Sequence, residues 1–244
     1  MGEWFEDWFD ADYAALYAHR DRREASLAVD TLLAAAPGFA HGPVLDLGCG
    51  SGRHLAELRR VNPLAFGLDL SPHLLGMAPA ELRGWLLRGD MRRLPFRPGT
   101  LAGVCLWFTP FGYFSDPENE ALLLNLQRLL QPEGVLLLDL MNPSRLRTSL
   151  VEEDTLERGG LRVRSRRSLE AGRVVKRMTL ERADSGEARE AVESVRLYEP
   201  AEIRSLARAC GLAPVRDLGD YDGSAFQEAA SPRWIGIFVK KLPG

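Results

Sequence analysis

An α/β fold with a doubly wound, mostly parallel sheet is predicted by the order of apolar runs and helical patterns along the 244 residues. Five apolar runs have the length of strands: 44–47, 65–70, 84–88, 101–108 and 135–140. Three segments between them have helical periodicity: 53–60, 72–79 and 117–130. Because parallel neighbours need a crossover connection, usually a helix, this order predicts a parallel sheet with helices on both faces.

A second, smaller sheet is predicted after the last of these strands. Charged and apolar residues alternate between 161 and 197, and turn signals at Gly172 and Ser185-Gly186 divide this segment into three antiparallel strands. We therefore expect a small antiparallel β cap at 158–198, inserted in the core.

The two ends of the chain complete the predicted domain. Residues 1–37 carry aromatic side chains at spacings near three and four, which predicts one or two helices that form an N-terminal lid. A helix at 201–210 and strands at 214–218 and 234–240 follow the cap and give the sheet an antiparallel C-terminal strand. The whole length then forms a single domain, 1–244.

Composition and charge exclude several classes of protein. The apolar fraction of 45% is ordinary, and no run approaches the roughly 18 apolar residues of a membrane span. A formal net charge of −3 makes nucleic acid an unlikely partner. The chain has three widely spaced cysteines: Cys49, Cys105 and Cys210. Its four histidines show no metal-ligand spacing. We expect a cytoplasmic protein without a disulfide framework or a metal.

A glycine-rich turn follows the first predicted strand. Asp46 lies inside that strand, and glycines stand at 48, 50 and 52. Glycine adopts positive φ and lets a ligand approach the backbone closely. A dinucleotide-binding turn, G-x-G-x-x-G, places its third glycine where Arg53 stands, which disfavours a nicotinamide oxidoreductase. The remaining alternative is a tight turn without a ligand.

The run Val44-Leu45-Asp46-Leu47-Gly48-Cys49-Gly50-Ser51-Gly52 resembles the first motif of class I S-adenosylmethionine-dependent methyltransferases, a family with a Rossmann-like fold. The resemblance covers about 100 residues. It implies that Gly48, Cys49 and Gly50 wrap the methionine part of S-adenosylmethionine (SAM). It also implies that the Asp46 carboxylate meets the SAM ammonium, in agreement with the attraction between opposite charges.

Two further segments fit a ligand that contains adenosine. Asp69 closes the second predicted strand, where an acidic side chain accepts both ribose hydroxyls, and Leu70 follows it. The segment 89–96 resembles the family segment that holds adenine. The resemblance implies that Asp90 accepts from the exocyclic amine and that the Met91 backbone N–H donates to the ring. Taken singly, each aspartate has the alternative role of a helix cap or a turn residue.

An aromatic run at 107–114 follows the fourth predicted strand, at the end of the sheet where cofactor and acceptor meet. It resembles a stretch of small-molecule N- and O-methyltransferases, including those acting on amino sugars. We expect Phe108 to contact the cofactor and Tyr113 to contact the acceptor, with core packing as the alternative. Ala102-Gly103 departs from the Phe-Asp with which such strands often begin.

Further candidates lie near both ends of the chain. Tyr13 and Tyr17, with Arg20 and Arg22 close by, are expected to cover the cofactor, and we assign Arg22 to its carboxylate. A plain docking helix is the alternative. The remaining acceptor candidates follow the later strands: Asn142, Tyr221 and Arg233. Their alternative is a solvated turn.

These features predict a SAM-dependent methyltransferase that acts on N or O of a small-molecule acceptor and yields S-adenosylhomocysteine. We expect a monomer or a homodimer. Catalytic residues are not assigned, because methyl transfer depends mainly on orientation and desolvation, although Tyr113, Asp222 and His19 are conceivable proton acceptors. An RNA or protein methyltransferase and a non-enzymatic SAM-binding module remain alternatives. The cap arginines alternate with glutamates, which favours a solvated face with ion pairs.

Overall fold

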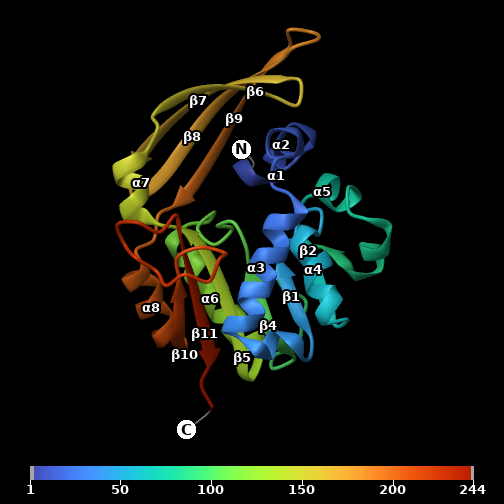
Figure 1. The fold of residues 1–244 in the computed structure, drawn as a ribbon, viewed down its shortest axis with the longest axis vertical. Coiled ribbons are helices and arrows are strands. Elements are labelled where there is room, and N and C mark those ends of the chain that lie inside the picture. The colour runs from blue at the N-terminus through green and yellow to red at the C-terminus, as the bar shows by residue number, and fades with distance from the viewer. Residues whose placement is uncertain (1–2, 243–244) are drawn as a thin grey trace.

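The computed structural model describes residues 3–242. Its central sheet has seven strands in the order β3-β2-β1-β4-β5-β11-β10 (Figure 1). The strands are β1 (Val44–Leu47), β2 (Ala65–Asp69), β3 (Leu86–Arg88), β4 (Leu101–Leu106), β5 (Leu130–Met141), β10 (Leu212–Leu218) and β11 (Arg233–Lys240). Strand β11 pairs antiparallel with β5 and β10, and the other neighbours pair in parallel. The predicted fold class is therefore confirmed.

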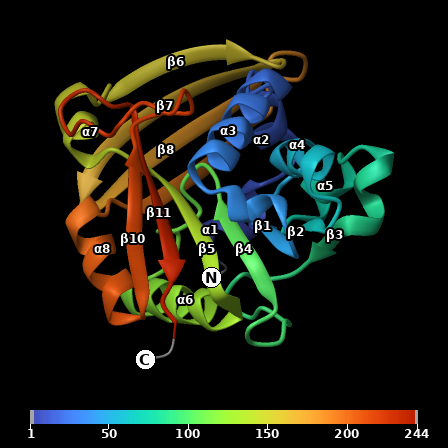
Figure 2. The same ribbon diagram turned by 60° about the horizontal axis from the view of Figure 1, so that its bottom comes forward.

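Helices cover both faces of this sheet (Figure 2). On one face lie α3 (Arg22–Ala35), the 3-10 helix η1 (Pro37–Ala40) and α4 (Arg53–Val61). On the other face lie α6 (Asp116–Leu129) and α8 (Pro200–Ala209). The elements α5 (Pro72–Gly76) and η2 (Ala80–Trp85) connect β2 to β3. Because β1 leads to α4 and β4 leads to α6 on the opposite face, the carboxyl ends of these neighbouring strands border the crevice where such folds bind ligands.

The cap is a separate antiparallel sheet of four strands that lies beyond those carboxyl ends (Figure 1). Its strands are β6 (Glu153–Arg158), β7 (Leu161–Glu170), β8 (Arg173–Arg182) and β9 (Ala188–Arg196). The sequence predicted three strands, and the fourth, β6, is mostly exposed and polar, so it lacks the alternation that marked the others. Helix α7 (Pro143–Ser149), also not predicted, leads from β5 to the cap.

The N-terminal segment forms three helices instead of the predicted one or two. Helices α1 (Trp4–Trp8) and α2 (Ala11–Leu16) precede α3, and the side chains of Asp10 and Asp21 accept backbone N–H groups where α2 and α3 begin. We call residues 4–20 the lid. Trp8 and Leu16 of the lid pack on the apolar face of the cap, so the lid lies between cap and core.

Packing explains why Ala102-Gly103 stands at the start of β4 in place of the Phe-Asp of similar strands. A Cβ atom on Gly103 would lie 2.6 Å from the ring of Phe39, which is fully buried in η1. Glycine at this position therefore lets the 3-10 helix pack directly on β4. Within residues 3–242, no helix is long and apolar enough to cross a membrane.

Candidate functional site

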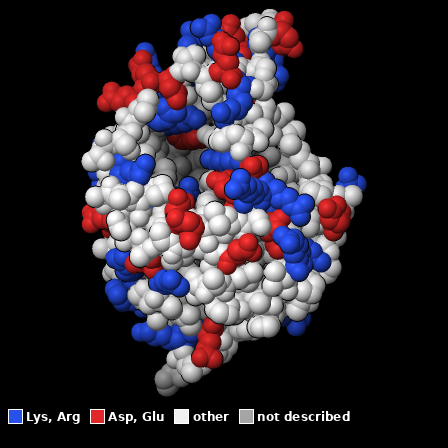
Figure 3. All heavy atoms as spheres, viewed as in Figure 1, with Lys and Arg blue, Asp and Glu red and all other residues white. Residues whose placement is uncertain are grey.

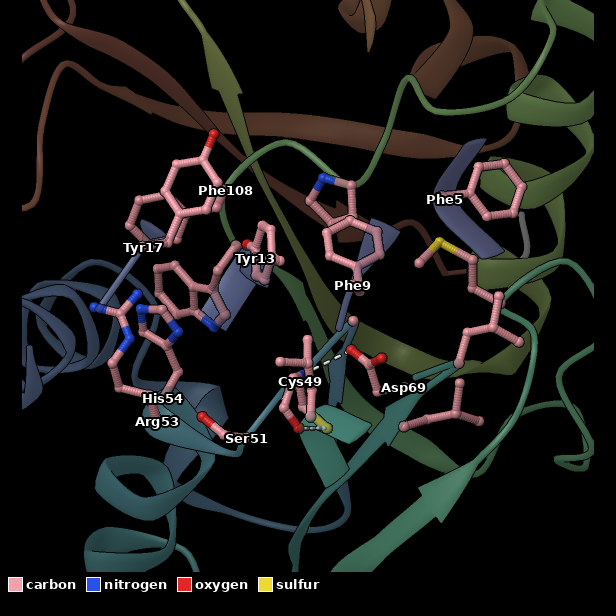
Figure 4. Close-up of a pocket in the computed structure, with 18 of the residues that line it drawn as sticks. Phe5, Phe9, Tyr13, Tyr17, Cys49, Ser51, Arg53, His54, Asp69 and Phe108 are labelled. Carbon is pink, nitrogen blue, oxygen red and sulfur yellow. Dashed lines mark hydrogen bonds between the residues drawn. The ribbon is translucent and has the colours of Figure 1, made fainter. Parts of the chain in front are cut away.

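A cavity of about 300 Å³ lies between the lid and the carboxyl ends of the sheet strands. Figure 4 shows Asp69 and Cys49 on one side of it and the rings of Phe9, Tyr13 and Phe108 on the other. The predicted residues that line it are Tyr13, Tyr17, Gly48, Cys49, Gly50, Asp69, Leu70, Asp90, Met91, Phe108 and Tyr113. Residues far apart in the sequence are thus brought to one concave site, as expected for a small-molecule ligand.

The glycine turn forms the floor of the cavity. Gly48, Gly50 and Gly52 have φ values of 76°, 56° and 81°, which only glycine adopts readily. A Cβ atom on Gly52 would also lie 2.7 Å from the side chain of Leu82. The turn is joined to β2 by the Gly48 N–H, which donates to the Leu68 carbonyl at 2.8 Å. The sequence therefore specifies both the backbone path and the open space above it.

Asp69 fixes the glycine turn and faces the cavity. One carboxylate oxygen accepts from the Gly50 N–H at 2.7 Å, and the other accepts from the Ser71 N–H at 2.8 Å. Burial raises the pKa of Asp69, and these backbone hydrogen bonds oppose the rise. Each carboxylate oxygen has a further lone pair, so the side chain can also accept from a pair of hydroxyls.

Asp46 lies beneath the turn and does not line the cavity. Its carboxylate is 1% exposed, and neither oxygen has a hydrogen-bond partner among residues 3–242. Burial and the charge of Asp69 raise the pKa of Asp46 to about 7. A buried carboxylate without a partner is costly, so this position fits a nearby cationic ligand, as an ammonium and a sulfonium provide.

Asp90 lines the cavity, but its carboxylate is already engaged. Arg92 donates to it through its backbone N–H at 2.8 Å and through Nη2 at 2.7 Å. Burial would raise the pKa of Asp90, yet the hydrogen bonds from Arg92 outweigh it and lower the pKa. To accept from an adenine amine as predicted, Asp90 therefore has to use an oxygen that already accepts from Arg92. Met91 lies beside it, and both remain proposed contacts.

The assignment of Arg22 needs correction. The Arg22 side chain is 75% exposed and pairs with Glu57 at 2.6 Å, outside the cavity. Arg22 begins helix α3, which turns its side chain toward α4. Arg20 lines the cavity instead, with its guanidinium 4.3 Å from the centre of the Phe108 ring and 4.5 Å from that of Tyr17. Arg20 is thus the lid arginine that is placed to meet an anionic group.

The end of the cavity near Arg20 combines cations with unpartnered polar atoms. Arg53 also lies over Phe108, at 5.1 Å, and pairs with Glu24. His54 and Trp107 stack at 4.7 Å, and neither His54 Nε2 nor Trp107 Nε1 has a hydrogen-bond partner in the described part of the chain. Burial lowers the pKa of His54 well below its usual value, so this imidazole is neutral.

Tyr113 lies under the lid, in contact with three of its rings. Its ring centre is 4.9 Å from that of Trp4 and 5.9 Å from that of Phe9. Arg173 of the cap donates to the carbonyls of Gly112 and Tyr113, at 3.0 and 2.9 Å, and to Phe114 O at 3.0 Å. The cap therefore holds the loop that presents Tyr113 to the cavity.

Three predicted acceptor residues do not line the cavity. Asn142 is 2% exposed and donates to the carbonyls of Glu228 and Ser231, so it ties the last loop to α7. Tyr221 and Arg233 lie behind Phe108, where both donate to the Asp139 carboxylate. The structure therefore places these three outside the cavity, because long-range hydrogen bonds hold the side chains elsewhere.

Several lining residues were not predicted, although the sequence contains signals for some of them. Phe5 and Phe9 line the cavity and belong to the aromatic pattern that predicted the lid. Arg53 and His54 open the helix after the glycine turn and reach the cavity from its first turn. Within residues 3–242, no group of three or more His, Cys, Asp or Glu side chains is arranged to hold a metal.

Comparison with known proteins agrees with this fold. Residues 44–134 match the family described as Methyltransferase domain. A curated relative, the 18S rRNA (guanine-N(7))-methyltransferase bud23 of Schizosaccharomyces pombe, is 40% identical over 80 residues. That match covers 32% of this chain and 28% of the relative, so the chain corresponds to less than a third of that protein.

Solved structures share the fold over nearly the whole chain. A SAM-dependent methyltransferase from Clostridium acetobutylicum has a TM-score of 0.78 at 14% identity, covering 93% of this chain and 95% of that one. The amino pentose methyltransferase CalS10 from Micromonospora echinaspora, solved with SAM bound, has a TM-score of 0.68 at 23% identity, covering 96% and 98%. The sugar N-methyltransferase KedS8 from Streptoalloteichus sp has a TM-score of 0.70 at 23% identity, covering 92% and 90%.

Fold and site together define a Rossmann-like α/β protein with a cavity at the carboxyl ends of its strands. The family match, the structural likeness and the curated relative indicate more particularly a SAM-dependent methyltransferase, with its methyltransferase domain at residues 44–134. The matched domain and the curated relative fit the predicted enzyme class, and a neighbour of the same fold is solved with SAM bound.

Proposed function

We propose that this chain transfers the methyl group of SAM to a nitrogen or oxygen atom of a small-molecule acceptor and releases S-adenosylhomocysteine. One observation carries the proposal: Asp69 and the glycine turn face the aromatic rings of the lid across a concave cavity (Figure 4). Such a cavity excludes water from a ligand of about cofactor size, which favours transfer of a methyl group between two bound molecules.

The hollow between cap and core is the route that we propose for the acceptor. Figure 3 shows this hollow with basic and acidic side chains around it. The aromatic loop, residues 107–114, meets the lid there, and Tyr113 lies where the two come together. Tyr113 is therefore the side chain that we propose for acceptor contact.

An acceptor with an amine is the first class to test. CalS10 is described as an amino pentose methyltransferase and KedS8 as a sugar N-methyltransferase. The likeness to them covers 96% and 92% of this chain, so it extends into the lid and cap, beyond the matched domain. We therefore propose that the acceptor is a sugar that bears an amine. Methylation of an oxygen atom in the same class of sugar is the nearest alternative.

RNA methylation is a second candidate, favoured by the curated relative. That relative is described as an 18S rRNA methyltransferase, but the shared stretch covers only 80 residues. The cap arginines, the candidates for contact with phosphates, are partly paired: Arg166 with Glu153, Arg167 with Asp154 and Arg177 with Glu170. With a formal net charge of −3, the chain lacks the basic surplus that supports binding to a phosphate backbone.

The described residues account for binding, orientation and exclusion of water. When bound, SAM supplies a methyl group on a positively charged sulfonium. Asp69 would accept from the ribose hydroxyls, Asp46 would favour the cationic end, and Arg20 would pair with the carboxylate. The lid rings keep water away, and Tyr113 orients the acceptor. We assign no general base.

We also propose a cytoplasmic location and a monomer or homodimer. Cys49, Cys105 and Cys210 are all free thiols in the structure. A reducing compartment is the environment in which unpaired cysteines are ordinary.

Calorimetric titration with SAM and, separately, with NADH tests the cofactor. We expect micromolar binding of SAM and none of NADH. Mass spectrometry then follows methyl incorporation from SAM into a panel of amino sugar nucleotides and into ribosomal RNA. A mass increase of one methyl group on an amino sugar supports the proposal, whereas methylation of the RNA alone selects the second candidate. SAM binding without turnover on any acceptor would favour a binding module.

A further inference from the structure

The cavity wall contains two neighbouring residues with an unusual backbone. Phe108 and Thr109 have φ values of 60° and 67°, in the left-handed region that favours glycine. Threonine is branched at Cβ and rarely adopts positive φ, because its side chain then crowds the backbone. Since such a conformation persists only where neighbouring groups enforce it, a specific contact must hold this pair.

Asp139 of strand β5 provides that contact. Its carboxylate is fully buried and accepts from the Phe108 backbone N–H at 2.8 Å. Its backbone carbonyl accepts from the Thr109 N–H, also at 2.8 Å. One residue of the neighbouring strand therefore binds both left-handed residues.

Two side chains from the C-terminal part of the chain fix the Asp139 carboxylate in turn. Arg233 Nε donates to one oxygen at 2.5 Å, and the Tyr221 hydroxyl donates to the other at 2.5 Å. Arg233 also lies 4.7 Å from the centre of the Phe108 ring, on which Arg20 and Arg53 lie at 4.3 and 5.1 Å. The ring is thus held among three guanidinium groups at the end of the cavity.

We propose that Asp139 is a positioning residue of the cofactor site: it holds Phe108 and Thr109 in their left-handed conformation and so places Phe108 against the bound methionine moiety. This inference rests on the proposed function, because that function supplies the SAM that Phe108 contacts. Asp139 does not line the cavity and takes no part in bond making. Its neighbours in β5, Leu138 and Leu140, are apolar, so the sheet itself does not require a carboxylate there.

Titration with S-adenosylhomocysteine (SAH) tests the proposal without any acceptor. In Asp139→Asn the amide cannot accept from both Phe108 and Arg233, so the loop relaxes and we expect SAH to bind about tenfold more weakly. Adding Thr109→Gly removes the cost of the left-handed backbone. In this double variant we expect the affinity to return to within about threefold of the wild type.

A matched control separates positioning from general stability. Arg204 and Asp217 form a similar ion pair between α8 and β10, away from the cavity. Asp217→Asn should lower the melting temperature slightly and leave the SAH affinity unchanged. If Asp139→Asn does not fold, Tyr221→Phe replaces it, because it retains the ring and removes one donor to Asp139; about threefold weaker binding, restored by Thr109→Gly, is then expected.

Two results would overturn the proposal. One is a folded Asp139→Asn, or Tyr221→Phe in its place, that binds SAH as tightly as the wild type. The other is a weakened variant that Thr109→Gly does not restore, since this would mark a loss of fold rather than of loop conformation. Failure of the wild type to bind SAH would instead reject the proposed function, so the two failures are distinguishable.

Discussion

The cofactor side and the acceptor side of this cavity are built in different ways. On the cofactor side, Asp69, the glycine turn and the strands that carry them lie within 50 residues of one another and are joined by backbone hydrogen bonds. On the acceptor side, the lid, the aromatic loop and the cap come from distant parts of the chain and are joined by side chains. Local sequence therefore determines the first side, and tertiary contacts determine the second.

Replacement of Asp69 should give the largest loss on the cofactor side. Asp69→Ala removes the acceptor for the Gly50 N–H and the carboxylate that we propose for the ribose hydroxyls, so we expect SAM affinity to fall about a hundredfold. Calorimetry measures the dissociation constant. Asp217→Asn, which removes a carboxylate far from the cavity, is the control. Wild-type affinity in Asp69→Ala would show that the turn binds SAM without this side chain.

The pH dependence of binding tests the buried carboxylate of the same side. Because burial raises the pKa of Asp46 to about 7, the folded protein retains a proton that the unfolded chain loses near pH 4. Stability without ligand should therefore fall as pH rises from about 4 to 7 and level off above it.

SAM binding should follow the opposite trend, because the ionised Asp46 attracts its cationic end. We expect affinity to rise by up to about tenfold per pH unit below pH 7 and to level off above it. Titrations between pH 5.5 and 8.5 measure this trend. Asp46→Asn should abolish both pH trends, and a persistent trend in that variant would assign the proton to another group.

Arg20 of the lid and Arg22 of α3 give the sharpest test of which arginine serves the cofactor site. Arg20→Ala should weaken SAM binding about tenfold, because a charge-assisted hydrogen bond in a cavity is lost. Arg22→Ala should leave affinity within about twofold, since Arg22 pairs with Glu57 on the outer surface. Equal losses of affinity in both variants, measured by calorimetry, would show that Arg22 also contributes to SAM binding.

The sequence predicted the glycine turn and the residues around it that line the cavity, because the structure there is local. Glycines with positive φ and an aspartate at a strand end are required by the backbone path itself. Arg20 and Arg22 could not be separated, because their directions depend on the start of α3 at Arg22, after the Asp21 cap. Likewise, Asn142 and Tyr221 follow predicted strands, but long-range partners at Ser231 and Asp139 turn them away from the cavity.

One signal for the support of the cavity wall was present in the sequence. Asp139 interrupts the apolar run 135–140, just as Asp46 interrupts the first predicted strand. A carboxylate inside a buried strand needs partners, so both positions indicate a functional or structural network. Its partners, Arg233 and Tyr221, are more than 80 residues away, and only the fold reveals them.

The smallest expected effect concerns the joint between lid and cap. Glu193 of β9 accepts from Trp8 Nε1 at 2.7 Å and from the Tyr17 hydroxyl at 2.9 Å. Lys176 of β8 lies 3.9 Å from the same carboxylate. Because both donors belong to the lid, loss of the Glu193 charge should let the lid leave the cavity more often without displacing it on average.

Glu193→Gln should therefore raise the dissociation rate of SAM about threefold, with a stability loss of roughly 0.5–1 kcal/mol. Stopped-flow measurement of tryptophan fluorescence follows the rate, since Trp8 lies at the joint and Trp107 lines the cavity. Glu190→Gln, on the exposed side of the same strand, is the matched control. If the dissociation rate does not change, the lid is held by its aromatic contacts alone, and the acceptor side depends less on charged side chains than its hydrogen bonds indicate.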